Sequence, residues 1–254
     1  MDSATQLELN AINRRFYAAI APEWSDTRKR PWPGWERVLS AMRARSAADS
    51  GGLRVLDLGC GDGRLWPFLR ERAPGLQYLG IDASAELLAL ARAREPSPHC
   101  TWLQADFIAQ PLPQPALEAH HDLICVFGVL HHVPSQARRA QLLRELAALL
   151  RADGVLAVTV WRLDEDPRFS SRRMRFEDYN RSAEHPIALD QLEPGDTLLR
   201  WGAHNAPPRY CHFPTPALLQ TLVEVSGLRV LERFRADGHE DRMNEYLLLT
   251  TAHK

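Results

Sequence analysis

Short apolar runs alternate with amphipathic stretches through the central part of the chain. Five runs have the length and apolar composition of buried strands: residues 53–57, 77–82, 100–104, 121–127 and 154–161. Apolar residues at helical spacing predict helices near 64–73, 84–95 and 134–151. This alternation is typical of an α/β fold, in which helices cover both faces of a mostly parallel sheet.

Capping residues indicate where these helices begin and end. Ser84 is a suitable N-cap for the second helix, and Ser135 or Pro134 opens the third. Gly154 is placed to end the third helix, because glycine is common just after a helix C-terminus. A proline-rich stretch at 111–115 predicts an extended loop between the third and fourth strands.

The chain before this core has a different pattern. Apolar residues from Leu7 to Ala21 lie at near-helical spacing, and a second helix is predicted from Trp35 to Arg45. Between them, residues 24–35 combine three tryptophans, two prolines and three cations. This composition indicates a stiff aromatic lid, which packs on the sheet, contacts a ligand directly, or does both.

The chain after the core is first charged and then regular again. Residues 162–209 predict an inserted, partly mobile segment over the active face, with a solvated charged loop as the alternative. A helix over 216–226 and strands near 228–235 and 244–251 then complete a seven-stranded sheet as an antiparallel pair. We therefore expect four parts: N-terminal helices and lid (1–50), core (51–161), inserted substrate-side segment (162–209), and C-terminal helix and strands (210–254).

Composition narrows the class of protein. The chain has 254 residues, 45% of them apolar, and a formal net charge of −1, so no overall basic field indicates a nucleic-acid partner. The four cysteines show no C-x-x-C spacing, which favours reduced thiols over a metal site or disulfides. No apolar run approaches the length of a membrane span, so we expect a cytoplasmic protein.

A glycine-rich turn follows the first predicted strand. Gly59, Gly61 and Gly63 let the backbone adopt positive φ and approach a ligand closely, and Asp57 ends the strand before them. A second strand ends in Asp82, where a carboxylate can hold two ribose hydroxyls. The order of strand, glycine turn, helix and acid predicts a nucleotide-type site at the carboxyl edge of the sheet.

Three motifs in this order resemble those of the S-adenosylmethionine-dependent methyltransferases with a Rossmann-like fold. They are Asp57-Leu58-Gly59-Cys60-Gly61-Asp62-Gly63, Gly80-Ile81-Asp82 and Gln104-Ala105-Asp106-Phe107. The resemblance implies that S-adenosylmethionine binds here, with its ribose on Asp82 and its adenine beside Asp106 and Phe107. It assigns the cofactor to Tyr17, Arg28, Asp57, Gly59, Cys60, Gly61, Asp82, Ala83, Asp106, Phe107 and Phe127.

A histidine pair follows the fourth strand. His131 and His132 would face the reacting centre, where a proton acceptor that titrates near neutrality would be useful. The alternative for each is a structural role, with one ring packed in the core and the other bonded to the backbone.

A narrower resemblance covers nearly the whole chain. Tyr17, the stretch Ser25–Pro33, Val158–Trp161, Gly195–Trp201 and Arg209–Phe213 stand in the same order as in the tRNA wobble-uridine methyltransferases that esterify 5-carboxymethyluridine. Arg200 replaces a proline of that family in the fourth of these motifs. The resemblance implies a tRNA substrate and, as a partner, a small zinc-ribbon activator protein.

The proposed acceptor is a carboxylate, which is ionised at neutral pH and needs no general base. It does need cations to hold it, and Arg28 and Arg209 are the candidates because a guanidinium grips a carboxylate with fixed geometry. We therefore predict catalytic roles for Arg28, His131, His132 and Arg209.

Other functions remain open at this point. A small-molecule O- or N-methyltransferase could share the same core, and a catalytically silent methyltransferase-like binding protein is a further alternative. A nicotinamide oxidoreductase is less consistent with the turn, because Arg64 stands where the dinucleotide fingerprint has its third glycine.

Overall fold

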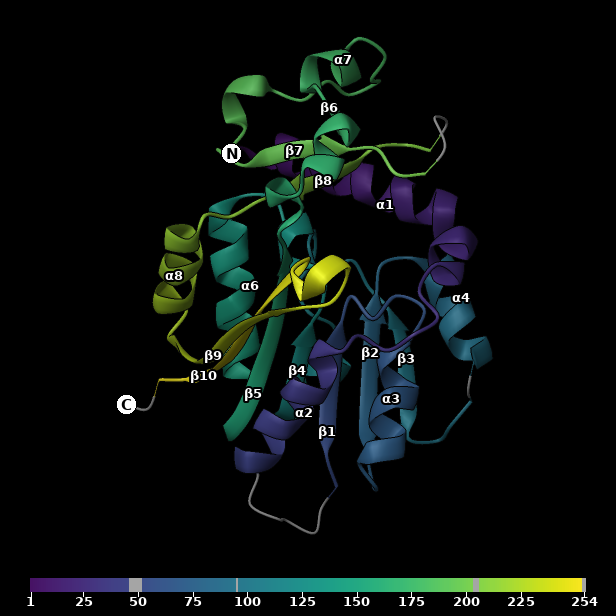
Figure 1. Cartoon of the computed structure of the whole chain (residues 1–254), viewed down its shortest axis with the longest axis vertical. Helices are drawn as coiled ribbons and strands as arrows, with labels where there is room; N and C mark the ends of the chain where they lie inside the picture. The colour runs from purple at the N-terminus through teal and green to yellow at the C-terminus, as the bar shows by residue number, and fades with distance from the viewer. Residues whose placement is uncertain (46–51, 95, 203–205, 253–254) are drawn as a thin grey trace.

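The computed structural model describes residues 1–45, 52–94, 96–202 and 206–252. Its main sheet has the strand order β3-β2-β1-β4-β5-β10-β9 (Figure 1). The strands are β1 (Arg54–Leu58), β2 (Gln77–Asp82), β3 (Cys100–Gln104), β4 (His121–Val126), β5 (Leu150–Trp161), β9 (Leu228–Ala236) and β10 (Asn244–Thr251). The predicted fold class is confirmed.

The sheet is parallel except at β10, which runs antiparallel to both of its neighbours. β1 pairs in parallel with β2 on one side and β4 on the other. The strand order therefore reverses at β1 and β4, and in open α/β sheets ligands bind in the crevice that this reversal creates at the carboxyl ends.

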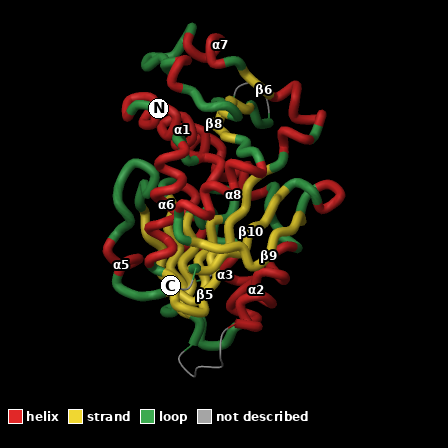
Figure 2. The backbone as a smooth tube through the Cα atoms, turned by 90° about the vertical axis from the view of Figure 1, so that its left-hand side faces the viewer, coloured by secondary structure: helices red, strands yellow, loops and turns green. Residues whose placement is uncertain are grey.

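Helices cover both faces of the sheet because consecutive strand residues point to opposite sides. Leu56 and Leu58 of β1 pack in one apolar cluster with α6, whereas Val55 packs in another with α2 and α3. Figure 2, which shows the sheet nearly edge-on, places α6 and α2 on opposite sides of it. These layers comprise α2 (Gly34–Arg45), α3 (Leu65–Arg72), α4 (Ala85–Arg94), α5 (Gln114–Leu117), α6 (Gln136–Ala148) and α8 (Pro216–Val225).

Two capping predictions are confirmed and one is wrong. The hydroxyl of Ser84 accepts from the amide of Leu87, and that of Ser135 accepts from Arg138. Gly154, however, lies inside β5 and does not end a helix. Helix α6 ends at Ala148, and the chain becomes extended at once because Leu150 pairs with His121 of β4.

The first helix is longer than predicted. α1 runs from Ser3 to Asp26 and includes Trp24, which the sequence pattern placed in the lid. Asp2 caps its first turn by accepting from the amide of Thr5. None of the helices in the described ranges is both long enough and apolar enough to cross a membrane.

The segment 162–209 is more regular than its charge pattern indicated. It contains β6 (Arg173–Met174), α7 (Phe176–Asn180) and β7 (Asp196–Leu199), and β7 pairs with β8 (Arg209–His212) in a three-stranded sheet of order β6-β7-β8. Leu198 and Tyr210 of this small sheet pack against Leu9 and Ile12 of α1. Figure 1 shows α1 and the small sheet together above the carboxyl ends of the main strands. The division of the chain into four parts stays a prediction.

Candidate active site

A cavity of about 820 Å³ lies at the carboxyl edge of the main sheet, and α1 and the small sheet lie over it. A volume of this size is in the range that small-molecule and cofactor sites occupy. Every residue assigned to the cofactor by sequence lines it: Tyr17, Arg28, Asp57, Gly59, Cys60, Gly61, Asp82, Ala83, Asp106, Phe107 and Phe127. His132 and Arg209 line it too, whereas His131 does not.

The glycine turn forms the floor of the cavity. Gly59 and Gly61 have φ of +76° and +57°, which favours glycine at both positions. A Cβ at Gly59 would lie 2.2 Å from Cγ2 of Val129, so a side chain there would also clash. The amide of Gly61 donates to Oδ2 of Asp82 over 2.8 Å, which ties the turn to the end of β2.

Carboxylates line one end of the cavity, and burial changes their protonation. Asp57 is buried and accepts a hydrogen bond from the Tyr78 hydroxyl. Burial raises the pKa of Asp57 to about 7, and the hydrogen bond from Tyr78 offsets only part of this effect. Burial also raises the pKa of Asp82, although the amides of Ser84 and Gly61 donate to its carboxylate and partly oppose the shift.

The third acid of this end is tied to α1. Asn10 donates to Oδ2 of Asp106 over 2.8 Å, and Arg14 forms an ion pair with the same oxygen at 3.5 Å. The amide of Ala109 also donates to Asp106. Helix α1 therefore reaches across the cavity to the end of β3.

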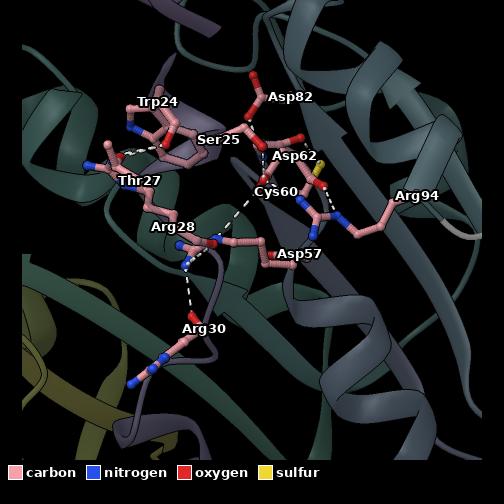
Figure 3. Close-up of polar contacts among 12 residues, drawn as sticks. Trp24, Ser25, Thr27, Arg28, Arg30, Asp57, Cys60, Asp62, Asp82 and Arg94 are labelled. Carbon is pink, nitrogen blue, oxygen red and sulfur yellow. Dashed lines mark hydrogen bonds and ion pairs between the residues drawn. The ribbon is translucent and has the colours of Figure 1, made fainter. Parts of the chain in front are cut away.

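The lid is held to the glycine turn by two residues to which the sequence analysis assigned no role in the site. Asp62 accepts from the hydroxyl of Ser25 over 2.6 Å and from Arg94 over 2.6 Å (Figure 3). Arg64 donates to the main-chain carbonyls of Arg28 and Arg30, each over 3.3 Å. Both residues lie in or beside the glycine motif, so their position in the sequence was the available signal.

Three aromatic rings surround Arg64. Its guanidinium carbon lies 5.7 Å from the ring centre of Trp24, 5.4 Å from that of Trp32 and 5.6 Å from that of Trp35. Cation–π attraction of this kind contributes about 0.5–2 kcal/mol per favourable contact. The tryptophans of the predicted lid therefore pack on the turn and also line the cavity.

His132 has a fixed tautomer. Its Nδ1 lies 2.7 Å from the carbonyl oxygen of Tyr210, so Nδ1 carries the proton and donates it. Nε2 consequently accepts from the hydroxyl of Tyr17 over 2.9 Å. Burial lowers the pKa of His132 to about 3, and the nearby charge of Arg209 adds to this. The ring is therefore neutral throughout the physiological pH range.

His131 has a different environment. Its ring packs on the indole of Trp161 with ring centres 4.0 Å apart, and neither ring nitrogen has a hydrogen-bond partner in the described part of the chain. Burial lowers its pKa well below the usual value. The expected proton acceptor that titrates near neutrality is therefore found at neither histidine, because both rings are desolvated.

Cations line the other end of the cavity. Arg209 is only 3% exposed, and its guanidinium lies 4.4 Å from the ring centre of Trp161. Its Nε and Nη1 have no hydrogen-bond partner among the described residues. Arg28 donates to the Trp24 carbonyl and to the Thr27 hydroxyl, and burial lowers its pKa to about 10.

This arrangement gives the cavity two chemically distinct ends. Burying an uncompensated charge is costly, so the unpartnered Arg209 favours an anionic ligand. The buried carboxylates Asp57 and Asp82 favour a ligand that carries hydroxyl donors and positive charge. One cavity can thus bring a cationic and an anionic molecule together.

A second cluster of ionisable groups lies in and beside the small sheet. Ligand atoms of Glu193, Asp196 and His212 lie within 4.8 Å of one another, as in some metal sites. Asp196 bonds to Nδ1 of His212 and to the Tyr210 hydroxyl, and Glu193 forms an ion pair with Arg139. These bonds account for the proximity of the three groups without a metal.

Comparison with known proteins agrees with this geometry. Residues 56–156 match the family model described as "Methyltransferase domain". Over 183 residues the chain is 28% identical to a tRNA (carboxymethyluridine(34)-5-O)-methyltransferase of Macaca fascicularis, covering 72% of this chain and 24% of that protein. The protein of that name from Schizosaccharomyces pombe is 27% identical over 233 residues, which cover 88% of this chain and 91% of the relative.

A relative with a different named substrate also matches. Trans-aconitate 2-methyltransferase of Azoarcus is 36% identical over 156 residues, covering 61% of this chain and 56% of that protein. The chain spans less than half of the length of the first curated relatives that it matches.

Solved structures support the fold. The CcbJ methyltransferase of Streptomyces caelestis has a TM-score of 0.64 at 18% identity, with 95% of this chain and 99% of that chain covered. A DhpI–SAH complex has a TM-score of 0.59 at 17% identity, with 97% and 98% covered. The chain therefore carries a methyltransferase domain with the Rossmann-like fold of the S-adenosylmethionine-dependent methyltransferases, and it is similar in sequence to the tRNA carboxymethyluridine methyltransferases.

Proposed function

We propose that this protein is an S-adenosylmethionine-dependent methyltransferase that esterifies the carboxymethyl group on the wobble uridine of a tRNA. The observation that carries the acceptor chemistry is the buried guanidinium of Arg209 in the cavity wall, whose Nε and Nη1 have no hydrogen-bond partner in the described ranges. The cofactor chemistry rests on the carboxylates of Asp57, Asp82 and Asp106 at the opposite end of the same cavity.

The donor set fits the cofactor. Asp82 ends β2 beside the glycine turn and would accept from the ribose hydroxyls, as the acid at this position does in nucleotide-binding sheets. Asp57 would face the positive charge of the methionine portion, and Asp106 would accept from the adenine amino group. S-adenosylmethionine supplies a methyl group on a sulfonium, which is a good leaving group.

The chain's own residues then need to align the acceptor and exclude water. Arg209 would hold one oxygen of the carboxylate and leave the other free as the nucleophile, since full bidentate pairing would weaken it. A carboxylic acid with a pKa of about 4 is already ionised at neutral pH, so no side chain has to remove a proton from the acceptor. Positioning of this kind can lower the activation free energy by about 7–11 kcal/mol.

The histidine and tyrosine at the centre of the cavity act as positioning residues in this proposal. His132 is neutral and holds the Tyr17 hydroxyl, so the tyrosine oxygen keeps a fixed orientation on the cavity wall. Arg28 adds a second positive charge on the acceptor side. His131 supports the wall by packing on Trp161 and does not reach the cavity.

One observation favours a second acceptor. The relative named for trans-aconitate also acts on a carboxylate, because trans-aconitate is a tricarboxylic acid. The guanidinium of Arg209 can bind a carboxylate of either acceptor. The formal net charge of −1 gives the protein no overall attraction to a polyanion such as tRNA. A small polycarboxylate is therefore the alternative substrate.

Mass spectrometry of tRNA nucleosides distinguishes the tRNA acceptor from the small polycarboxylate. Cells that lack this protein should accumulate carboxymethyluridine and lose its methyl ester, and the purified protein with S-adenosylmethionine should restore the ester. Unchanged tRNA nucleosides together with methylation of trans-aconitate in vitro would establish the alternative. Calorimetry that shows tight NADH binding and no S-adenosylmethionine binding would overturn both.

Two further features of the resemblance belong to this proposal. A small zinc-ribbon activator protein would bind the enzyme, and the reaction would take place in the cytoplasm. Co-purification of such a protein from the native source, and fractionation of its cells, would test these two predictions.

A further inference from the structure

Two arginines are joined by a main-chain hydrogen bond at the end of the small sheet, and one of them, Arg172, lines the cavity. We propose that Arg172 and Arg200 form a phosphate clamp, which holds the RNA backbone while the modified base enters the cavity. This inference rests on the proposed tRNA acceptor and names the part of the surface that would recognise it.

The backbone places the two arginines opposite each other. β6 and β7 are antiparallel, with Arg173 opposite Leu199, and the next pair in this register is Arg172 with Arg200. The amide of Arg200 donates to the carbonyl of Arg172 over 2.8 Å, which continues the ladder by one step. Arg172 is the last residue of a 3-10 turn, and its guanidinium carbon lies 5.0 Å from the ring centre of Phe169. The main-chain hydrogen bond still keeps the two arginines adjacent, and like charges on adjacent strands repel each other.

Neither arginine has a compensating carboxylate. Among the residues that the structure describes, Arg172 and Arg200 take part in no ion pair, and both are exposed. Three other exposed arginines of the same segment have carboxylate neighbours: Arg168 has Asp166, Arg175 has Glu177 and Arg181 has Asp178. Arg173 is also exposed and has no ion pair among the described residues. The repulsion between Arg172 and Arg200 would be relieved by an anion that contacts both.

The pair is continuous with the candidate active site. Arg172 lines the same cavity as Arg209, and Trp201, which follows Arg200, lines it as well. A buried cation therefore lies deep in the site and an exposed pair lies at its mouth. A carboxylate on a base suits the buried Arg209, and the more strongly hydrated phosphates of the same nucleotide suit the exposed pair. The indole of Trp201 offers an aromatic surface on which an unpaired base can stack.

The experiment measures RNA binding, which does not depend on turnover. The probe is an anticodon stem-loop RNA that carries carboxymethyluridine, and its Kd is measured by fluorescence anisotropy between about 50 and 200 mM salt. The test variant combines Arg172→Ala with Arg200→Ala. The control variant combines Arg168→Ala with Arg181→Ala, which removes the same charge from the same segment but from arginines that have carboxylate partners.

We expect the test variant to reduce the slope of log Kd against log salt by about 1.4–1.8, since each phosphate contact contributes about 0.7–0.9. The control variant should keep the wild-type slope. The control variant should bind S-adenosylmethionine within twofold of the wild type, because Arg168 and Arg181 are not among the residues that line the cavity.

Several results would overturn the clamp. One is an unchanged slope in the test variant, and another is an equal reduction in both variants, which would indicate only a general effect of charge. Failure of the proposed function is distinguishable. A wild-type protein that binds no RNA but methylates trans-aconitate would remove both the clamp and the tRNA acceptor, while methyl transfer to a carboxylate would stand.

Discussion

At the scale of single residues, two buried arginines show how a charged side chain can indicate a ligand. Arg162 is buried and lies 3.0 Å from a carboxylate oxygen of Glu245, and it also donates to the carbonyl of Pro214. Arg209 is equally buried, but no described carboxylate neutralises it. The charge of Arg162 is therefore compensated within the fold, although its Nε makes no hydrogen bond, whereas Arg209 lines the cavity with no ion pair among the described residues.

Replacing Arg209 should separate acceptor binding from cofactor binding. We expect Arg209→Ala to reduce kcat/KM for the methyl acceptor at least about 30-fold, because losing one partner of a buried charge pair costs about 2–5 kcal/mol. Arg209→Lys should restore only part of the activity, since lysine keeps the charge but loses the planar fork. The measurement is steady-state methylation of carboxymethyluridine-containing tRNA beside calorimetric titration of S-adenosylmethionine.

Cofactor affinity of the Arg209→Ala variant should stay within about threefold of wild type, a change of less than about 0.7 kcal/mol. If that variant binds cofactor poorly, or methylates tRNA as well as the wild type does, Arg209 is structural. In either case the carboxylate acceptor loses its main support.

Asp57 should make stability depend on pH. Its pKa is raised to about 7 in the folded protein by burial, whereas an unfolded aspartate titrates near 3.8. The folded state therefore binds the proton more tightly, and stability falls as pH rises through this window. In the absence of cofactor we expect the wild type to lose about 2–3 kcal/mol more than Asp57→Asn between about pH 5 and pH 8.

The measurement for Asp57 is chemical denaturation of both proteins across that pH range. Subtracting the slope of unfolding free energy against pH in the variant from that in the wild type cancels the contributions of the other titrating groups. A pH-independent loss of stability caused by the substitution does not affect either slope. Parallel pH profiles would show that Asp57 is ionised in the folded protein at neutral pH.

At the scale of elements, α1 connects parts of the site that are far apart in the sequence. Asn10 bonds to Asp106 after β3, Tyr17 bonds to His132 after β4, and Ser25 bonds to Asp62 in the glycine turn. Because one helix contacts all three, its position is linked to the shape of the whole cavity. The lid that follows it, residues 27–33, is held through Arg64.

This arrangement predicts where protease cuts. Trypsin should cleave the free enzyme after Arg28 or Lys29, and not after Arg30 because Pro31 follows it. S-adenosylhomocysteine should suppress the cut, because a ligand in the cavity stabilises the closed lid. Ser25→Ala should speed cleavage of the free enzyme, since it removes the hydrogen bond to Asp62. The readout is the rate of appearance of the fragment by mass spectrometry.

Ser40→Ala is the matched control for this experiment. Its hydroxyl bonds only to the carbonyl of Glu36 within α2, so cleavage at the lid should keep the wild-type rate. Equal cleavage with and without ligand would show that the lid does not close over the site.

At the scale of the whole molecule, the near-zero net charge conceals a strong separation of local charges. Asp57, Asp82 and Asp106 line the cavity from the edge of the main sheet. Arg209, whose Nε and Nη1 have no hydrogen-bond partner among the described residues, lines it from the small sheet. The cavity lies between these two sheets and α1, so a ligand that fills it would contact all three. Cofactor binding should therefore stabilise the protein as a unit.

Thermal unfolding should report this stabilisation. S-adenosylhomocysteine at about 100 times its Kd should stabilise the protein by about 2.7 kcal/mol and raise Tm by about 5–10 °C. Asp82→Ala should weaken cofactor binding about 10- to 100-fold, because it removes hydrogen bonds to a charged group. At the same ligand concentration its Tm shift should be about half that of the wild type or less. A full shift in the variant would show that Asp82 does not hold the ribose.

The sequence by itself determined the main sheet and the cofactor end of the site. Each strand is a local apolar run, and each acid lies within two residues of the carboxyl end of its strand, so parallel order is enough to bring Asp57, Asp82 and Asp106 to one edge. The glycine turn is equally local, because its positive φ angles are a property of the residues themselves. The antiparallel end of the sheet was predicted for the same reason.

Only the tertiary structure decided the acceptor end. The start of β5 was missed because Arg151, Ala152 and Asp153 are exposed and give no apolar signal. The small sheet was missed because its strands are short and β6 pairs with β7 across the charged stretch 175–195, and no local pattern records that pairing. The sequence indicated Arg209 by resemblance, but a side chain is shown to lack a partner only when all its neighbours are placed. Ion pairs join residues far apart along the chain, and the pair with Glu245 distinguishes the compensated charge of Arg162 from that of Arg209, which has no ion pair among the described residues.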